Sequence, residues 1–487
     1  MSLTVRGALL WSFAERYSSL VVTVASTMAL ARLLTPLQVG IFSLCSAVTT
    51  VAGILRDFGI SEYLVQEKNL TRDKLRAAFG IAIVIAWSIG AVVFSIRGVV
   101  ASYFNEPGVA EVLGVLSLNF LILPFASPAF ALLTREMAFR KIFVIQLTSN
   151  SVQSATAVGL AYAGFGYMSL AWAPVASIVV QTALVSWFRP GDTFLLPSLK
   201  NGGSVLRYGS MFVSSRVVET FTRNAHEFII GKQFGFASVG LFSRGFGLIE
   251  LFYSNVTAAV LRVTAPAFAN DRRDGNDLAT RYSLGTSMLT VIAWPFFGFV
   301  ALMSKELILV LFGSQWLATA PIATALALSV MPNYLTAMGP SLLAATGHIK
   351  RRLMITIANA PIHLLAILVA SNWGLVAMAA AFGVSGLFAL AIYVHQLPRL
   401  LGCSVSSLFG ACGKSAVVAA ACIAAQVITH VTCDAAQISN MMALILVVAA
   451  AVPTWLLAAR LTSHPAYIEL ARFVQSRRRP TTALPGP

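Results

Sequence analysis

Ionisable side chains recur at helical spacing inside a long apolar segment, residues 208–231. The spacing of 3, 4, 3 and 1 residues places them on one face of an α-helix, because each residue turns about 100°. The face comprises Phe212, Ser215, Arg216, Glu219, Arg223, His226 and Glu227. Arginine binds phosphate and carboxylate groups through paired hydrogen bonds. The spacing therefore predicts a polar face that can hold an anionic group.

A second polar face occupies the same positions 200 residues earlier, in segment 8–31. It comprises Ser12, Glu15, Arg16, Ser19, Thr23, Ser26 and Thr27. One ionised side chain at mid-membrane costs about 3 kcal/mol, so the four on the later segment cost about 12 kcal/mol against lipid. Both faces must therefore meet protein or water.

Two interpretations of these faces stay open. In the first, Glu219 pairs with Arg216 and Arg223, and Glu227 pairs with Arg223, in a neutral ladder that only fixes helix packing. In the second, the faces line a water-filled central cavity for a polar substrate, to which Arg244 is added from the next apolar segment. The second interpretation is favoured, because a ladder needs no matching face of hydroxyl groups.

The elements that position these faces are membrane-spanning helices. The 487 residues are 57% hydrophobic and 11% charged, and the apolar residues come in runs of about 20, the length that crosses a bilayer as a helix. This composition excludes a soluble enzyme, a disordered chain and a secreted disulfide scaffold. Fourteen segments are predicted, at roughly 8–31, 39–60, 77–100, 111–133, 143–163, 167–188, 208–231, 239–262, 282–303, 317–343, 353–371, 374–397, 412–431 and 440–459.

The basic residues indicate how these segments are oriented. If the N-terminus is cytoplasmic, 26 Lys and Arg residues fall on the cytoplasmic side and four on the outer side. This asymmetry predicts an even number of spans with both termini in the cytoplasm. The basic residues lie in short loops, so no nucleic-acid partner is predicted.

An internal repeat divides the chain. Val39-Gly-Ile-Phe-Ser43 recurs as Val239-Gly-Leu-Phe-Ser243, and Arg32 matches Lys232 at the same offset. Each copy holds an even number of helices, so the predicted repeat is parallel, about an axis along the membrane normal. The predicted parts are two six-helix lobes (1–200 and 201–400), two extra C-terminal helices (401–460) and a basic cytoplasmic tail (461–487).

Catalytic and cofactor motifs are absent from the sequence. It has no phosphate-binding glycine loop, no HExxH, no GxSxG and no Cys/His cluster with metal-ligand spacing. We therefore predict a protein that is not an enzyme and has no cofactor and no metal site.

Several phrases resemble the multidrug/oligosaccharidyl-lipid/polysaccharide (MOP) exporter superfamily, and specifically the Wzx-type polysaccharide flippases. They are Leu30-Ala-Arg-Leu-Leu-Thr-Pro36, Asp57-Phe-Gly59, Gly231-Lys-Gln-Phe-Gly235, Gly313-Ser-Gln-Trp316 and Ala345-Thr-Gly347. The resemblance covers about residues 5–400. One departure concerns residues 224–227, where the family often has Asn-x-Asp and this chain has Asn224-Ala-His-Glu227.

The resemblance implies a flippase that moves undecaprenyl-diphosphate-linked oligosaccharide across the inner membrane by alternating access, for exopolysaccharide or lipopolysaccharide assembly. It implies partners in the lipid bilayer, among them a polysaccharide polymerase and chain-length or export proteins. The expected substrate-binding residues are Arg16, Arg216, Arg223, Ser19, Thr23 and Arg244. The expected ion-coupling residues are Glu15, Glu219 and Glu227. The alternatives are a drug/cation antiporter of the same superfamily and a membrane polysaccharide polymerase or ligase.

Overall fold

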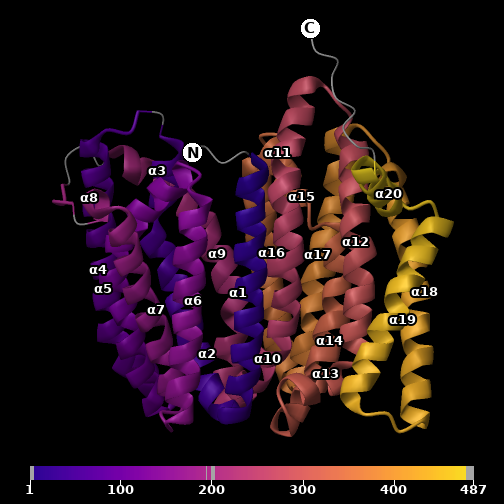
Figure 1. The fold of residues 1–487 in the computed structure, drawn as a ribbon, viewed down its shortest axis with the longest axis horizontal. Helices are drawn as coiled ribbons and strands as arrows, with labels where there is room; N and C mark the ends of the chain where they lie inside the picture. The colour runs from indigo at the N-terminus through magenta and orange to yellow at the C-terminus, as the bar shows by residue number, and fades with distance from the viewer. Residues whose placement is uncertain (1–4, 68, 194, 199–202, 479–487) are drawn as a thin grey trace. The chain divides into compact units, whose positions relative to one another are not determined.

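The computed structural model describes residues 5–478 apart from 68, 194 and 199–202. The side chains of residues 5–10, 12, 13, 62, 66, 203–215 and 473–478 lie outside the description. Every regular element in the described ranges is helical (Figure 1). Among the residues that the structure describes, eleven helices are long and apolar enough to cross a membrane. The predicted class, an all-α membrane protein, agrees with this architecture.

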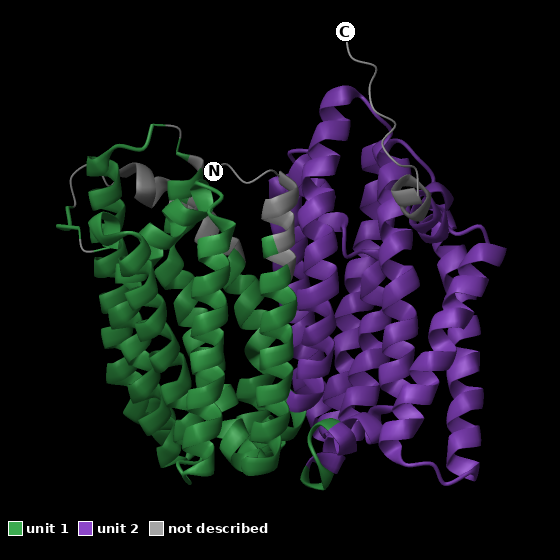
Figure 2. Ribbon diagram, in the orientation of Figure 1, with its two compact units in different colours: residues 1–243, 311–315 green, residues 244–310, 316–487 purple. Residues whose placement is uncertain are grey.

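Unit 1 comprises residues 1–243 and 311–315 (Figure 2). Within it α6 packs against both α1 and α7, α4 packs against α5, and α9 packs against α2. One of its apolar cores gathers around Leu44, Val112 and Leu113. The helices are α1 (Val5–Leu33), α2 (Pro36–Asp57), α3 (Ile60–Gln66), α4 (Arg72–Phe104), α5 (Pro107–Arg135), α6 (Phe139–Tyr162), α7 (Tyr167–Phe188), α8 (Pro190–Thr193), α9 (Gly203–Phe234) and the first part of α10 (Phe236–Phe252).

Unit 2 comprises residues 244–310 and 316–487. Within it α12 packs against α18, α18 against α19, and α17 against both α14 and α16. After α10 its elements are η1 (Tyr253–Thr257), α11 (Ala258–Asp274), α12 (Leu278–Leu302), α13 (Ser304–Leu311), η2 (Ser314–Thr319), α14 (Ala320–Val330), η3 (Met331–Leu335), α15 (Gly339–Ala345), α16 (Ile349–Ala370), η4 (Ser371–Trp373), α17 (Leu375–Leu401), α18 (Val405–Ala435), α19 (Asn440–Leu461) and α20 (Pro465–Arg478).

Residues at its two ends determine where α2 begins and ends. Thr35 caps its N-terminus by accepting a hydrogen bond from the Gln38 backbone N–H, and the Gln38 side chain accepts one from the Thr35 N–H in return. At the other end, Phe58 and Gly59 have φ angles of 38° and 65°. Two consecutive left-handed residues end a helix. The Asp57-Phe-Gly59 phrase is thus the turn that separates α2 from α3.

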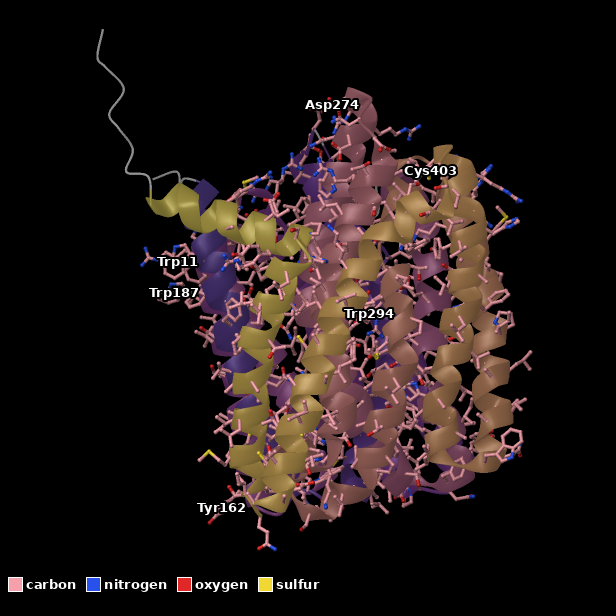
Figure 3. The ribbon with its side chains drawn as sticks, turned by 90° about the vertical axis from the view of Figure 1, so that its right-hand side faces the viewer. Trp11, Tyr162, Trp187, Asp274, Trp294 and Cys403 are labelled. Atoms are coloured by element: carbon pink, nitrogen blue, oxygen red, sulfur yellow. The ribbon has the colours of Figure 1, made fainter. Side chains whose placement is uncertain are left out.

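Side chains at the helix ends show which ends share a side within each unit (Figure 3). In unit 1, Trp11 and Trp187 lie toward one end, and Tyr162 lies at the opposite end. In unit 2, Asp274 and Cys403 lie together at one end of that unit, and Trp294 lies midway along α12. This arrangement is the one that the alternating path of predicted spans requires.

Two predicted spans differ from the helices observed. Segment 239–262 was expected to end where its apolar residues end, but the helical path continues to Asp274. The extra turns are amphipathic, and Asp271 in them is paired with Arg281 of α12 at 2.6 Å. Segment 317–343 is broken into α14, η3 and α15, because Pro332 and Pro340 stand at helix starts where no N–H is needed.

The number of spans, fourteen, stays a prediction. Beyond the eleven apolar helices, α1, α6 and α9 correspond in position to the predicted segments 8–31, 143–163 and 208–231. These three helices are less apolar because they carry polar faces. The predicted lobe boundary between residues 200 and 201 lies outside the described residues.

Candidate functional site

The polar face of α1 divides into a packed part and an accessible part. Ser19 Oγ accepts a hydrogen bond from Asn150 Nδ2 of α6 at 3.0 Å, so this serine takes part in helix packing. Glu15 and Arg16 are half-buried, whereas Thr23 is exposed. Ser12 lies outside the described side chains. Ser26 and Thr27 are also half-buried, so Glu15, Arg16 and Thr23 stay reachable from solvent together with these two residues.

The polar face of α9 changes from exposed to buried along the helix. Arg216 and Glu219 are exposed, and Arg223 is half-buried. His226 and Glu227 are 1% and 8% exposed. The side chains of Phe212 and Ser215 lie outside the description. The two arginines thus reach solvent, and the acidic end of the face is enclosed.

Glu227 is the most enclosed carboxylate of the two faces. Its Oε1 lies 3.7 Å from His226 Nε2, and the His226 ring packs against Phe242 with centroids 5.0 Å apart. Within the described part of the chain its Oε2 is buried and has no hydrogen-bond partner. The ladder contact from Glu227 to Arg223 stays one of the two open interpretations. A buried carboxylate without a donor is costly unless a proton or cation joins it.

The two copies of the repeated phrase meet at the start of α2 and of α10. A Cβ atom built on Gly40 would lie 1.8 Å from the Phe236 carbonyl oxygen, and one on Gly240 would lie 2.0 Å from the Pro36 carbonyl oxygen. Ser43 Oγ donates a hydrogen bond to Ser243 Oγ at 3.0 Å. Only glycine permits so close an approach of two backbones. Positions separated by 200 residues therefore contact each other at a helix crossing inside unit 1.

A cavity of about 400 Å³ opens beside α2, lined also by α5 and α7. We call it the α2 cavity. Its polar lining is Ser46, Thr49, Thr50, Arg56, Asp57 and Asn119. The volume lies within the range of about 300–1,000 Å³ that is typical of ligand sites. Hydroxyl, amide and guanidinium groups around such a space can hydrogen-bond a sugar or a phosphate.

The charge of Arg56 in this cavity is compensated locally. Its Nη2 lies 2.6 Å from Asp57 Oδ1, and the guanidinium lies 5.6 Å from the Phe120 ring centroid. The cavity is therefore polar but close to neutral, which suits sugar hydroxyls better than a free anion. None of these lining residues is among the site residues that the sequence predicted. The spacing of Ser46, Thr50, Gly53 and Asp57 on one helical face was the available signal.

The structure brings only some of the predicted residues into one unit. Arg244 lies in unit 2, where its guanidinium stands 5.2 Å from the Trp316 ring centroid. The other eight lie in unit 1, namely Arg16, Arg216, Arg223, Ser19, Thr23, Glu15, Glu219 and Glu227. Within unit 1, α1 packs on α6 and α9 packs on α2, so the two polar faces belong to different helix pairs.

Comparison with known proteins places the chain in a family. A family model described as "Polysaccharide biosynthesis protein" matches residues 29–321. The chain is 27% identical over 321 residues to the succinoglycan biosynthesis transport protein ExoT of Rhizobium meliloti (strain 1021), covering 66% of this chain and 65% of that protein. It is 22% identical over 298 residues to the lipopolysaccharide biosynthesis protein WzxC of Escherichia coli (strain K12), covering 60% of each. The alignments thus span somewhat less than two thirds of these relatives.

Solved structures agree on the fold. The lipid II flippase MurJ in an inward closed conformation superposes with a TM-score of 0.77 at 12% identity, covering 95% of this chain and 100% of that one. An inward-facing multidrug resistance MATE family transporter of the MOP superfamily superposes with a TM-score of 0.65 at 14% identity. This superposition covers 79% of this chain and 94% of the transporter. Together with the apolar helices, these similarities make the protein a multi-pass membrane protein. The chain belongs to the polysaccharide biosynthesis protein family.

Proposed function

We propose that this protein is a flippase that moves undecaprenyl-diphosphate-linked oligosaccharide from the cytoplasmic to the outer leaflet of a bacterial inner membrane. The observation that carries the proposal is the match of 29–321 to a polysaccharide biosynthesis family on a fold similar to that of a lipid II flippase. The polar faces inside an otherwise apolar chain support it, because a drug-sized apolar substrate would not need them. Undecaprenyl diphosphate is the lipid carrier that the family resemblance implies.

The two ends of the substrate need different chemistry. A diphosphate is held by cationic donors, and the reachable guanidinium groups of Arg16, Arg216 and Arg223 supply them in this proposal. The oligosaccharide needs neutral donors and acceptors, which the α2 cavity supplies through Ser46, Thr50 and Asn119. The lipid tail stays in the bilayer throughout.

A coupling ion is assigned to Glu227 in this proposal. Its burial and its bare Oε2 make its charge state responsive to a proton or a monovalent cation. Glu15 and Glu219 are more accessible to water and have the weaker basis for such a role. Uptake of the ion would then favour one of the two alternating-access states.

The remaining expectations are part of the same proposal. Both termini lie in the cytoplasm, and two six-helix lobes at 1–200 and 201–400 alternate about the substrate. Residues 401–460 and the tail 461–487 are additions to this transport unit. The meeting of Gly40 with Gly240 supports the repeat, because equivalent positions contact each other only near a symmetry axis. A polysaccharide polymerase and chain-length or export proteins would receive the product.

A deletion strain tests this function. The lipid-linked saccharide pool is extracted and resolved by membrane leaflet, with a plasmid-borne copy of the gene as the control. We expect a complete repeat unit to accumulate on the cytoplasmic face while the polymer is lost, and the plasmid to restore both. An unchanged pool together with new drug sensitivity would overturn the proposal in favour of a drug/cation antiporter.

A further inference from the structure

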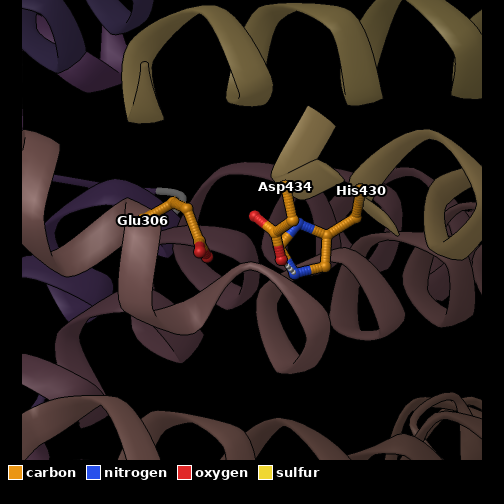
Figure 4. Close-up of side chains that lie close together, drawn as sticks. All are labelled: Glu306, His430 and Asp434. Carbon is orange, nitrogen blue, oxygen red and sulfur yellow. Dashed lines mark ion pairs between the residues drawn. The ribbon is translucent and has the colours of Figure 1, made fainter. Parts of the chain in front are cut away.

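Three potential metal ligands meet in unit 2, away from the polar faces of unit 1. Glu306 lies in the first turn of α13, while His430 and Asp434 lie one turn apart near the end of α18. One ligand atom from each lies within 4.8 Å of the others. His430 Nε2 is 3.6 Å from Asp434 Oδ2. Figure 4 shows the Glu306 carboxylate directed toward the other two side chains.

Glu306 gives an independent reason to expect a ligand here. The residue is only 7% exposed, and its Oε2 is buried without a hydrogen-bond partner among the residues described. His430 Nδ1 is also buried and lacks a partner in the described ranges. A carboxylate that is removed from water and left without a donor is strongly unfavourable. A cation between Glu306 and His430 would remove this cost.

The donor set selects the kind of cation. Calcium and magnesium prefer sites built from oxygen atoms alone, whereas imidazole nitrogen favours zinc and its transition-metal neighbours. Two carboxylates and one neutral imidazole balance the charge of a divalent ion. Asp434 is exposed, with 68% of its side chain accessible, so an ion can enter from water. Three protein ligands leave a coordination position for a water molecule.

We propose that Glu306, His430 and Asp434 bind one divalent transition-metal ion, for which Zn²⁺ is the reference. Ligand atoms stand about 2.0–2.2 Å from zinc. The three ligand atoms now lie within 4.8 Å of one another, and binding would draw them closer together. His430 and Asp434 already stand at the i, i+4 spacing on α18 that lets two ligands share an ion. Because Asp434 is exposed and α13 is short, we expect side-chain rotation to bring the three ligand atoms together.

The site would fasten the C-terminal helices to the preceding bundle. Beside it, Met303 packs in a small apolar cluster with Cys433 of α18 and Leu444 of α19. The ion would add a polar clamp between α13 and α18 at the edge of this cluster. The predicted orientation puts this end of unit 2 on the outer side of the membrane. The inference does not depend on the substrate proposed above.

Metal binding by the purified, full-length protein tests the proposal. Any affinity tag is removed, bound metal is stripped with a chelator, and the protein is titrated with ZnCl₂ by isothermal titration calorimetry. We expect one Zn²⁺ per chain and a Zn²⁺-dependent rise in Tm, because a ligand that binds the folded state stabilises it. Ca²⁺ is expected to bind at least tenfold more weakly.

Variants locate the ion. Glu306→Gln and Asp434→Asn should each weaken Zn²⁺ binding by about tenfold or more, since even indirect partners of a metal ligand contribute that much. His395→Gln is the matched control, an exposed histidine on α17 outside the cluster. Asp434→Asn keeps the test valid if the buried Glu306 is needed for folding. Absence of Zn²⁺ binding, wild-type affinity in Asp434→Asn, or tighter binding of Ca²⁺ would overturn the proposal.

Discussion

At the scale of single residues, the spacing of polar side chains could be predicted but their burial could not. The sequence placed Arg216 and Glu227 on one face of a helix, and α9 carries both. It did not distinguish the exposed Arg216 from the buried Glu227, because burial depends on which helices pack nearby. It also did not indicate the approach of His226, whose Nε2 lies 3.7 Å from Glu227 Oε1.

Replacing Arg216 with alanine should reduce export without lowering protein level. Loss of a hydrogen bond to a charged group costs about 1.5–3 kcal/mol, or roughly 10–150-fold in affinity. Arg216→Lys should recover part of the activity, because it restores charge but not the paired geometry. The measurement is surface polysaccharide in the complemented deletion strain. Arg273→Ala, an exposed arginine on α11, is the control. Normal export by Arg216→Ala would remove this residue from the substrate site.

Replacing Glu227 with glutamine separates coupling from packing. Glutamine has nearly the same shape and carries no charge, so a buried position whose second carboxylate oxygen has no hydrogen-bond partner among the described residues should accept it with an unchanged or higher Tm. Export should nevertheless fall by about tenfold or more, because the ion-binding charge is lost. Glu219→Gln, at an exposed position of the same helix, is the matched control. A lower Tm with normal export would instead mark Glu227 as a structural residue.

The contact between Gly40 and Gly240 gives a prediction about stability. Alanine at Gly40 would place a methyl group 1.8 Å from a carbonyl oxygen, so α2 and α10 must separate. We expect a loss of about 1–3 kcal/mol or more and a lower Tm in detergent. Gly159→Ala on α6 is the control, since a Cβ there meets nothing within 4 Å. Equal Tm values for the two variants would show that the close crossing is absent in the protein in detergent.

At the scale of elements, helix type and position were predictable, but helix ends and breaks were not. Runs of apolar residues locate the membrane part of a helix and say little about its polar continuation. For that reason α11 extends to Asp274 while the predicted span ended at 262. The breaks around η3 depend on Pro332 and Pro340, whose effects vary with local packing. The α2 cavity was missed because hydroxyl residues in a span also occur without a ligand.

The start of α20 should make stability sensitive to acid. His464 Nδ1 accepts a hydrogen bond from the Ala466 N–H at 3.0 Å, and Nε2 lies 3.0 Å from both Ser287 Oγ and Ser415 Oγ. The bonded Nδ1 fixes the neutral tautomer with its proton on Nε2. Burial, with Lys414 nearby, lowers the pKa of His464. The unfolded chain therefore takes up a proton near pH 6.5 that the folded chain does not, and stability falls as pH drops below that value.

This acid sensitivity is measured as Tm against pH from 8 to 5. His464→Gln should lower Tm at pH 8, because the Ala466 N–H loses its acceptor, and should flatten the decline below about pH 6.5. His348→Gln, a partly exposed histidine in another loop, is the control. A pH profile in His464→Gln that parallels the wild type would contradict the assignment.

At the scale of the whole molecule, the sequence predicted a membrane protein that resembles polysaccharide biosynthesis proteins. The apolar helices and the family match confirm these two predictions. Composition and the order of short motifs along the chain do not depend on how helices pack, so they can be recognised without a structure. The count of fourteen spans, the lobes at 1–200 and 201–400, and the cavity between them depend on how distant segments meet. They stay predictions.

The measurement that tests the central claim most directly is leaflet transfer in proteoliposomes. Purified protein is reconstituted with a fluorescent undecaprenyl-diphosphate oligosaccharide, and a membrane-impermeant reagent that destroys the label reports which leaflet holds it. We predict that the wild type exposes the inner-leaflet pool to the reagent, and that Arg216→Ala with Arg223→Ala does not, while Arg273→Ala behaves as the wild type. Transfer by the wild type no faster than in protein-free liposomes would contradict a flippase, and equal transfer by the double variant would contradict the arginine site.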